Sequence, residues 1–455
     1  MSTLQVGGSL VAPPDGASTT TMSKAAPAKP RLAAGLMRKG AWAVADQGLF
    51  SGSNFIVNIM LANWLSPTEY GAFATAFAAF LLVGVIHTAM FTEPMLVYSP
   101  DRYKGRLKEY FGALLRWHVV VSLVGSAGLA AVGLYLDWRG QVALGRALAW
   151  FAVSGPFTLL LWMMRRSCYA QMNPRRAAVA GAIYLVIMMV ALVAIHQLGV
   201  LTIGSALMMM AACSLVASTW LAVGHVRVGR LPNHMLRDVA VDHWRYGKWA
   251  TTTQLLGFLP SNVYYFVLPK LATLEQSGAL RALTNLVNPF VQANAALCLL
   301  LLPAFVRFRG TSDGKRVHGL ALLGLAGGPL VYWLFLGLFS HQVLHLVYHD
   351  KYQQYASLLW IIGLQPVILG MSGTYGSLLR ANQKLNAIFW GGVVAAATAI
   401  TLGIEMTRKF GLAGVCWSIL ITLTVHHLTL WLFSRGVHRK GTPASPQPMD
   451  ALAPV

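Results

Sequence analysis

The sequence has few charged residues and very few acids. Only 11% of its 455 residues are charged, with 14 Asp and Glu in all, whereas a soluble domain usually contains about 25% charged residues. Its four cysteines show neither a metal-ligand spacing nor a disulfide pattern. It also lacks a nucleophile elbow, a phosphate-binding loop and a carboxylate pair at hydrolase spacing. These absences argue against a water-soluble protein, a metal site and an enzyme.

Long apolar runs fill the chain instead. Apolar residues make up 56% of the sequence, and the mean hydropathy is +0.58. A helix needs about 20 residues to cross the hydrocarbon layer, and runs of that length predict an all-α, polytopic membrane protein. The twelve predicted spans are residues 42–64, 70–92, 111–135, 143–164, 177–197, 201–224, 247–268, 279–303, 317–340, 354–379, 386–406 and 412–434.

The formal net charge of +21 follows the predicted topology. With the N-terminus in the cytosol, 27 of the 35 Lys and Arg residues fall on the cytosolic side of the spans, and six fall on the opposite side. This asymmetry obeys the positive-inside rule and places both termini in the cytosol. It argues against nucleic acid as a partner and leaves attraction to anionic membrane lipid as a secondary effect.

The twelve spans divide into two halves of six. Residues 41–225 are predicted to form an N-lobe, residues 247–435 a C-lobe, and residues 226–246 a cytosolic linker. Residues 1–40 and 436–455 have no apolar run and are predicted to be disordered cytosolic tails.

An internal repeat supports this division. At an offset of 207 residues, Gln47 matches Gln254 and Gly71 matches Gly278, with seven identities between positions 42 and 72. Because six spans separate the copies, both halves have the same orientation. We expect an axis along the membrane normal to relate them, with a cleft between the lobes.

Three predicted spans carry a polar stripe on one helix face. In the first and the eighth, the polar residues step by four, three and four, a spacing that places them on one side of a helix. The stripes are Gln47, Ser51, Asn54 and Asn58 in the first, Arg281, Asn285, Asn288 and Gln292 in the eighth, with Thr251, Gln254, Ser261 and Asn262 in the seventh. Polar side chains are costly in lipid and face the bundle interior or water. The stripes therefore predict a hydrated cleft, with hydrogen bonding between packed helices as the alternative.

Three basic residues near these spans are candidate anion contacts. Arg281 lies about one turn inside the outer end of the eighth span, where its planar guanidinium could bind a phosphate or extend outward to the interface. Lys270, at the outer end of the seventh span, could assist it. Arg116, near the cytosolic end of the third span, could meet an anionic headgroup or likewise extend to the interface.

Acids within the predicted spans are candidates for ion coupling. Asp46 lies near the inner end of the first span and Glu93 at the inner end of the second. A carboxylate at the membrane edge can carry a coupling proton or sodium ion, or it can pair with a neighbouring arginine. Asp46 is the first choice because it lies on the striped helix.

The stretch DQGLFSGSNFIVNIMLANWLSPTEYGAFATAFAAFLLV (residues 46–83) resembles the bacterial polysaccharide flippases, the O-antigen and exopolysaccharide branch of the multidrug/oligosaccharidyl-lipid/polysaccharide (MOP) exporter superfamily. Their first span opens with a polar Asp/Gln-Ser-Asn segment and ends in Leu-Ala-x-x-Leu-Ser/Gly-Pro-x-Glu-Tyr/Phe-Gly, as residues 61–71 do here. The stretch FTEPMLVYSP (91–100) is similar to a subgroup of this family. In the second half, PKLATLEQSGALRALTNLV departs from the pattern at Pro269 and Leu274.

The resemblance implies a two-lobed, MATE-like transporter of the cytoplasmic (inner) membrane. It would flip a polyprenyl-pyrophosphate-linked oligosaccharide by alternating access, with no cofactor beyond a coupling proton or sodium ion. Pyrophosphate and sugars cannot cross about 30 Å of hydrocarbon unaided. Under this interpretation Arg281 contacts the pyrophosphate, and a polysaccharide polymerase or glycosyltransferases are expected partners. The further substrate-binding candidates are Asn54, Asn58, Gln254, Asn285, Asn288, Gln292, Lys270 and Arg116.

Two other functions remain open at this point. A cation-coupled drug or metabolite antiporter of the same superfamily would share the fold, but its often cationic substrates favour a pocket rich in acids. A non-transporting membrane scaffold of a glycan-assembly complex would use the stripes only for helix packing. The scarcity of acids and the position of Arg281 favour an anionic substrate.

Overall fold

The computed structural model describes residues 30–223, 226, 231–309 and 311–439, and these residues form helices without strands. The first half contains α1 (Pro30–Trp64), α2 (Pro67–His87), the π-helix η1 (Thr88–Thr92), α3 (Glu93–Tyr98), η2 (Lys104–Arg106), α4 (Leu107–Trp138), α5 (Val142–Ala170), α6 (Pro174–Gln197) and α7 (Ile203–Ala222). The second half contains α8 (Asn233–Asn262), α9 (Tyr264–Leu271), α10 (Leu274–Arg307), α11 (Ser312–Leu338), α12 (Ser340–Tyr348), η3 (Gln353–Leu358), α13 (Leu359–Ile362), α14 (Gln365–Ala381) and α15 (Leu385–Arg439).

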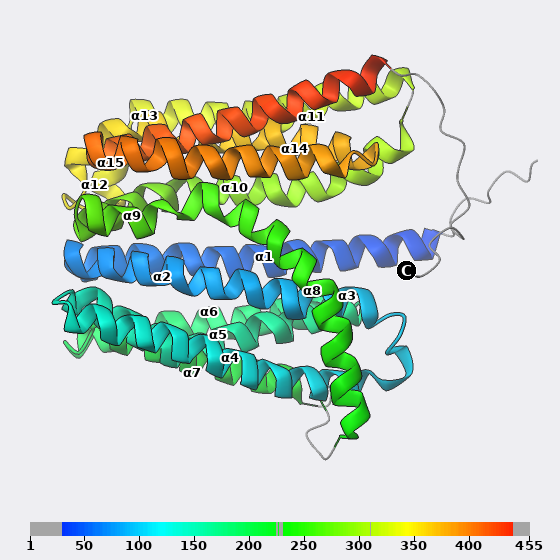
Figure 1. The fold of residues 1–455 in the computed structure, drawn as a ribbon, viewed down its shortest axis with the longest axis horizontal. Helices are drawn as coiled ribbons and strands as arrows, with labels where there is room; N and C mark the ends of the chain where they lie inside the picture. Colours follow the sequence, from blue (N-terminus) through cyan, green and yellow to red (C-terminus); the bar gives the residue numbers. More distant parts are fainter. Residues whose placement is uncertain (1–29, 224–225, 227–230, 310, 440–455) are drawn as a thin grey trace, which may run out of the picture.

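The twelve predicted spans fit these helices. Nine helical stretches in the described ranges are long and apolar enough to cross a membrane. One of them, α15, holds two predicted spans, because Gly411 interrupts it with a φ of 54° and a ψ of −132°, and the chain turns back there (Figure 1). α1 and the α8–α9 pair are not among the nine. These are helices whose polar stripes lower their hydropathy.

The boundaries of two segments differ from the prediction. α1 begins at Pro30, within the predicted tail, while residues 1–29 and 440–455 lie outside the described residues. α8 begins at Asn233, so most of the predicted linker is helical. The seventh span is a broken helix, with Pro260 inside α8 and the break near Val263 before α9.

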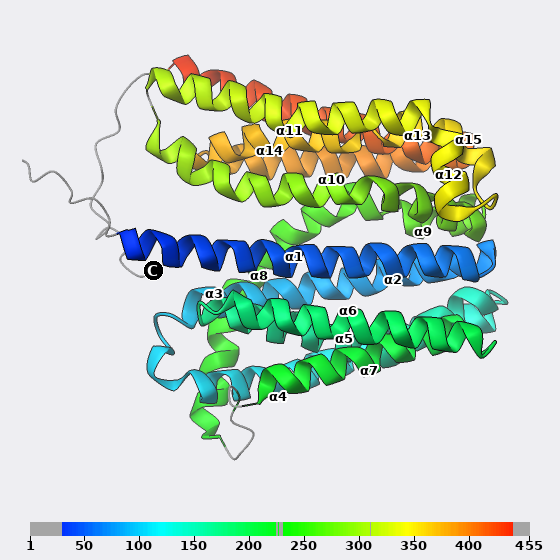
Figure 2. The ribbon, with the colours of Figure 1, turned by 180° about the vertical axis from the view of Figure 1, so that it is seen from behind.

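The helices form two bundles with α1 and α2 between them (Figures 1 and 2). One bundle contains α4–α7 and the other α9–α15, and α8 crosses between the two (Figure 1). α1 packs against α6 and α10, and α2 packs against α5 and α10, so this pair contacts both bundles. α1 begins and α15 ends at the same end of the molecule, as the predicted topology requires. We call this the inner end and the opposite one the outer end.

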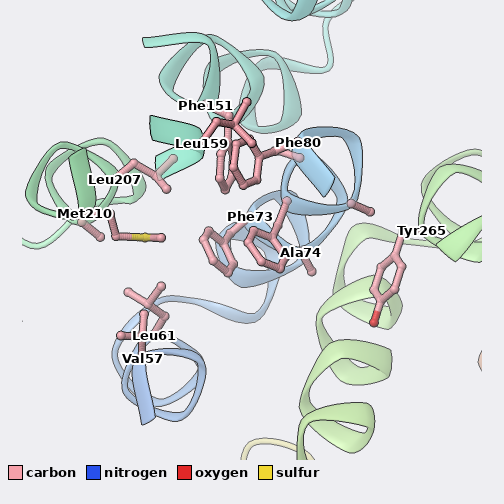
Figure 3. Packing of buried hydrophobic residues seen from close by; sticks show 14 of the residues in the cluster. Val57, Leu61, Phe73, Ala74, Phe80, Phe151, Leu159, Leu207, Met210 and Tyr265 are labelled. Atoms are coloured by element: carbon pink, nitrogen blue, oxygen red, sulfur yellow. The ribbon is translucent and has the colours of Figure 1, made fainter. Parts of the chain in front are cut away.

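Aromatic side chains pack the N-lobe around α2. The ring of Phe151 from α5 lies between those of Phe73 and Phe80 from α2, with centroids 5.7 and 5.4 Å away. Leu61 of α1 and Met210 of α7 approach the same cluster (Figure 3). α2 is apolar on nearly all sides, and its neighbours bury most of its residues. This packing holds α1 and α2 in place against the rest of the N-lobe.

The two copies of the internal repeat contact each other at the outer end, through α2 and α10. Ser66 and Thr273, which are 207 residues apart, cap α2 and α10 through side-chain oxygens that accept backbone N–H groups. The two helices then cross at their glycines: Gly278 lies against Gly71, and a Cβ on Gly71 would overlap the carbonyl oxygen of Leu274. The contact is reciprocal, as expected where a pseudo-twofold axis passes between repeated elements.

We expect Gly71→Ala to destabilise the protein by about 1–3 kcal/mol, because the added methyl group forces α2 and α10 apart. Thermal unfolding in detergent measures the effect. Gly128→Ala is the matched control: a Cβ at Gly128 in α4 has open space around it, and alanine favours a helix over glycine. Equal melting temperatures for the two variants would contradict the close contact.

Candidate functional site

A cavity of about 390 Å³ lies between the two lobes. α1, α2 and α5–α7 line one side, and α8, α9, α10 and α14 line the other. Among the described residues in this lining, Arg281 is the one charged side chain, and carboxylates are absent. The polar residues beside it include Asn54, Thr158, Ser261, Asn262, Thr284, Asn288, Gln292 and Gln365. The predicted polar gap between the lobes is therefore present and carries one positive charge.

Arg281 is a buried cation facing this cavity. Only 7% of its surface is exposed, so it does not extend outward to the interface, which was one of the two predicted alternatives. Its Nε donates to Oδ1 of Asn58 at 2.9 Å, and its guanidinium carbon lies 4.6 Å from the ring centre of Phe77. In the described part of the chain, no carboxylate lies within ion-pair distance of it.

Asn58 holds this arginine in position. Its Oδ1 accepts from Arg281 and, at 3.4 Å, from the hydroxyl of Tyr70. Its Nδ2 donates to the backbone oxygen of Asn54 at 2.7 Å, one turn earlier in α1. Since Asn58 is 1% exposed, its geometry suits positioning Arg281 better than contacting a sugar.

The predicted amide residues divide into two groups. Asn54, Asn288 and Gln292 line the cavity together with Arg281. Asn285 does not: it is 1% exposed, and its Nδ2 donates to the backbone oxygen of Phe55 at 3.2 Å. Asn285 therefore joins α10 to α1, and for this residue the helix-packing alternative describes the structure.

Three other predicted contacts lie away from the cavity lining. Lys270 is exposed at the outer end of α9, and Arg116 is exposed on α4; neither side chain lines the cavity. Their contact with substrate is not supported by this geometry. Gln254 belongs to a second cavity near the inner end, where its Nε2 donates to Oε1 of Glu93 at 2.6 Å. Both Gln254 and the candidate coupling acid Glu93 thus lie at the inner mouth of the protein.

Asp46, the other candidate coupling acid, has a cationic partner. Its carboxylate lies 2.8 Å from Arg165 of α5 and accepts from the hydroxyl of Tyr169 at 2.7 Å. Asp46 and Arg165 are 2% and 7% exposed. The predicted fourth span ends at residue 164, just before Arg165, whereas α5 continues to Ala170 and buries Arg165. The scarcity of acids could have indicated this pair, because an aspartate buried within a helix bundle requires a cationic partner nearby.

A lysine closes the outer end. Lys351 follows α12 in the C-lobe, and its Nζ donates to three backbone oxygens at the C-terminus of α1: Ala62 at 3.4 Å, Leu65 at 2.8 Å, and Asn63. A cation stabilises these unpaired carbonyls and the negative end of the helix dipole. Burial lowers the pKa of the Lys351 ammonium, so the contact is lost at a lower pH than an exposed lysine would allow.

Two further hydrogen bonds join the lobes beside Lys351. Asn63 donates to the backbone oxygen of Val347 at 2.7 Å, and Thr68 donates to Glu275 at 3.1 Å. With the glycine crossing of α2 and α10, these contacts seal the outer end. The inner end instead contains the second cavity, of about 670 Å³, which is lined by α3, α8 and α14. The two ends of the molecule therefore differ: hydrogen bonds join the lobes at the outer end, whereas a cavity lies at the inner end.

Solved transporters share this fold. The chain is similar to the inward-facing conformation of a multidrug resistance MATE family transporter of the MOP superfamily, with a TM-score of 0.68 and 14% identity, covering 88% of this chain and 100% of that one. For the lipid II flippase MurJ in an inward closed conformation, the TM-score is 0.64 with 12% identity, covering 88% and 87%. For the outward-facing MATE transporter it is 0.59 with 14% identity, covering 89% and 96%. No family model and no curated protein matches the sequence. The described chain has the fold of these solved transporters.

We expect Lys351→Met to open the outer end. A hydrogen bond to a charged group contributes about 1.5–3 kcal/mol, so losing it shifts the equilibrium from a closed towards an open outer end by about ten-fold or more. A Ser277→Cys reporter measures this shift, because Ser277 is fully buried in the first turn of α10. Labelling by an impermeant thiol reagent should accelerate. Lys409→Met, which removes an exposed cation paired with Glu405, is the control and should change nothing.

We expect Asp46→Asn to lower stability by about 3–5 kcal/mol, because Arg165 then remains buried without its counter-charge. Replacing both residues, by Asp46→Asn with Arg165→Gln, should recover much of this loss. Melting temperatures of the two variants provide the comparison. A double variant less stable than the single one would show that the unpaired charge of Arg165 is not the cause of the loss.

Proposed function

We propose that the protein moves a polyprenyl-pyrophosphate-linked oligosaccharide across the cytoplasmic membrane by alternating access, for surface polysaccharide or exopolysaccharide biosynthesis. The observation that carries the proposal is Arg281, buried in the space between the lobes without a carboxylate partner in the described chain. A buried charge without compensation costs several kcal/mol. An anionic substrate removes this cost, and a pyrophosphate matches the planar guanidinium.

The rest of the lining suits a glycan next to the phosphates. Asn54, Asn288 and Gln292 present amides that can both donate to and accept from sugar hydroxyls. A cavity of about 390 Å³ has room for the headgroup and the first sugars, while the polyprenyl tail stays in lipid. Longer glycans would extend through the open inner mouth.

The closed outer end supports loading from the cytosolic side. In the proposed cycle, substrate enters through the inner mouth, and closure there accompanies release of the Lys351 contacts outside. A coupling proton or sodium ion would drive the change, with Asp46 and Glu93 as the candidate acids. For Asp46 to bind a cation, its pair with Arg165 must separate, so coupling would require movement of α1 against α5.

Two observations weigh against the alternatives. A drug antiporter with cationic substrates needs a negative pocket, and the described lining has Arg281 but no acid. A scaffold needs no cavity, and its polar residues would then join packed helices, as Asn285 joins α10 to α1. Neighbouring genes for a polysaccharide polymerase or glycosyltransferases, the proposed partners, would favour the flippase further.

We expect Arg281→Ala to abolish glycan export and Arg281→Lys to restore only part of it, because an ammonium supplies the charge without the bidentate fork. Export of surface glycan at matched expression and membrane insertion is the measurement. Arg146→Ala removes an exposed arginine near the outer end of α5 and should export normally. Full export by Arg281→Ala would remove Arg281 from the site.

A further inference from the structure

The second cavity, at the inner mouth, has the composition of a headgroup site. It is lined by one face of α8, by the end of the α2–α3 segment and by α14. Two arginines, Arg245 of α8 and Arg380 in the last turn of α14, lie on this lining, and neither forms an ion pair among the described residues. Glu93 is the acid in the described lining, and its carboxylate already accepts from Gln254. The mouth therefore has a positive excess.

Aromatic side chains lie beside these two cations. Trp249, with 71% of its surface exposed, and Tyr246 project from the same stretch of α8, and Tyr98 lines the cavity from α3. Such rings offer large apolar faces with polar tips, the kind of surface on which a sugar ring packs. Two arginines in one cavity with aromatic side chains fit a phosphate-bearing group with a sugar attached.

The two arginines lie on parts of the chain that pack against different lobes. The first half of α8 is fixed to the N-lobe: Asp242 accepts from the hydroxyl of Tyr103 at 2.7 Å, and Nδ1 of His243 lies 2.7 Å from the backbone oxygen of Met90. Arg245 follows directly on this anchored stretch, whereas Arg380 lies in the C-lobe. An anion bound by both would connect the lobes at the inner end.

α8 also connects the mouth to the central cavity. Trp249 and Thr253 line the mouth, while Ser261 and Asn262 of the same helix line the cavity that contains Arg281. Eight residues separate Thr253 from Ser261, a distance of about 12 Å along a helix. The polar stripe of the seventh span thus runs from one site to the other.

We propose that the inner mouth is a docking site for the diphosphate headgroup of a lipid, bound by Arg245 and Arg380 before the headgroup reaches Arg281. This inference rests on the proposed function. By bridging the lobes, the docked headgroup favours closure of the inner end, since a ligand stabilises the state in which it makes more contacts.

The test uses Thr253→Cys in the mouth and Asn288→Cys in the central cavity as separate reporters, in phosphatidylcholine nanodiscs. An impermeant thiol reagent labels each variant, and labelling of the parent chain, whose cysteines are buried or half-buried, is subtracted. Farnesyl diphosphate is the probe, and farnesol is the uncharged comparison. At ten times its dissociation constant the diphosphate should slow labelling of Thr253→Cys by about ten-fold, and farnesol should not.

Arginine variants test whether the inner mouth binds the headgroup independently of Arg281. Protection of Thr253→Cys should disappear with Arg245→Gln and Arg380→Gln together and persist with Arg281→Gln. The control pair, Arg237→Gln with Lys384→Gln, removes two nearby cations that do not line the mouth and should retain protection.

Three results would overturn the inference. Protection of Asn288→Cys without protection of Thr253→Cys leaves the proposed function standing and removes the mouth site. Protection of Thr253→Cys that survives loss of both arginines removes their role. Protection by phosphatidylglycerol in the nanodisc or by inorganic pyrophosphate, as strong as that by farnesyl diphosphate, assigns the site to bulk lipid or free phosphate. If Asn288→Cys alone stays unprotected, the proposed function fails instead.

Discussion

The structure depends on one electrostatic constraint, a guanidinium held inside a membrane protein without a protein counter-charge. In a low-dielectric interior, an unpaired charge is stable only with hydrogen bonds, polarisable neighbours or water around it. Arg281 has the carboxamide of Asn58 and the ring of Phe77 as neighbours, and its side chain lines the cavity. Closing the two lobes tightly around it would remove that solvation. The charge therefore favours a structure with a hydrated space between its lobes, or with an anion there.

At the outer end, a small set of contacts joins the two lobes. Near the outer end α2 and α10 meet at glycines, which allows backbone to touch backbone, and Lys351 binds the end of α1 across the lobes. Both contacts are small, local and formed between backbone groups or with them. Contacts of this kind can break as a unit when the lobes rotate, without disturbing the aromatic packing of Phe73, Phe80 and Phe151 within the N-lobe.

The sequence predicted the fold well, because a hydrophobic solvent constrains a helix strongly. Span positions, the two halves and the polar faces of α1 and α10 followed from hydropathy, charge asymmetry and helical period. Period alone could not separate Asn288 from Asn285, one turn apart, since only the packing of α1 decides which one is covered. A count of charges on each side of the membrane could not reveal the partners of Arg165 and Lys351, for the same reason. Each was assigned to a loop, although its role depends on a partner more than 100 residues away.

Other buried charges in the described chain have partners of opposite charge, and this makes the lack of a carboxylate near Arg281 informative. Asp46 forms an ion pair with Arg165 and accepts a hydrogen bond from Tyr169. The buried Asp242 likewise forms an ion pair with Arg102 and accepts a hydrogen bond from Tyr103. The chain thus compensates buried carboxylates closely, even with only 14 acids available. An acid near Arg281 would neutralise it at little structural cost, since α1 and α10 carry amides of similar shape at Asn54 and Asn288. Such an acid would also compete with any phosphate for the guanidinium. A site that omits it keeps its positive charge available, which is useful only if an anion from outside the protein arrives to occupy it.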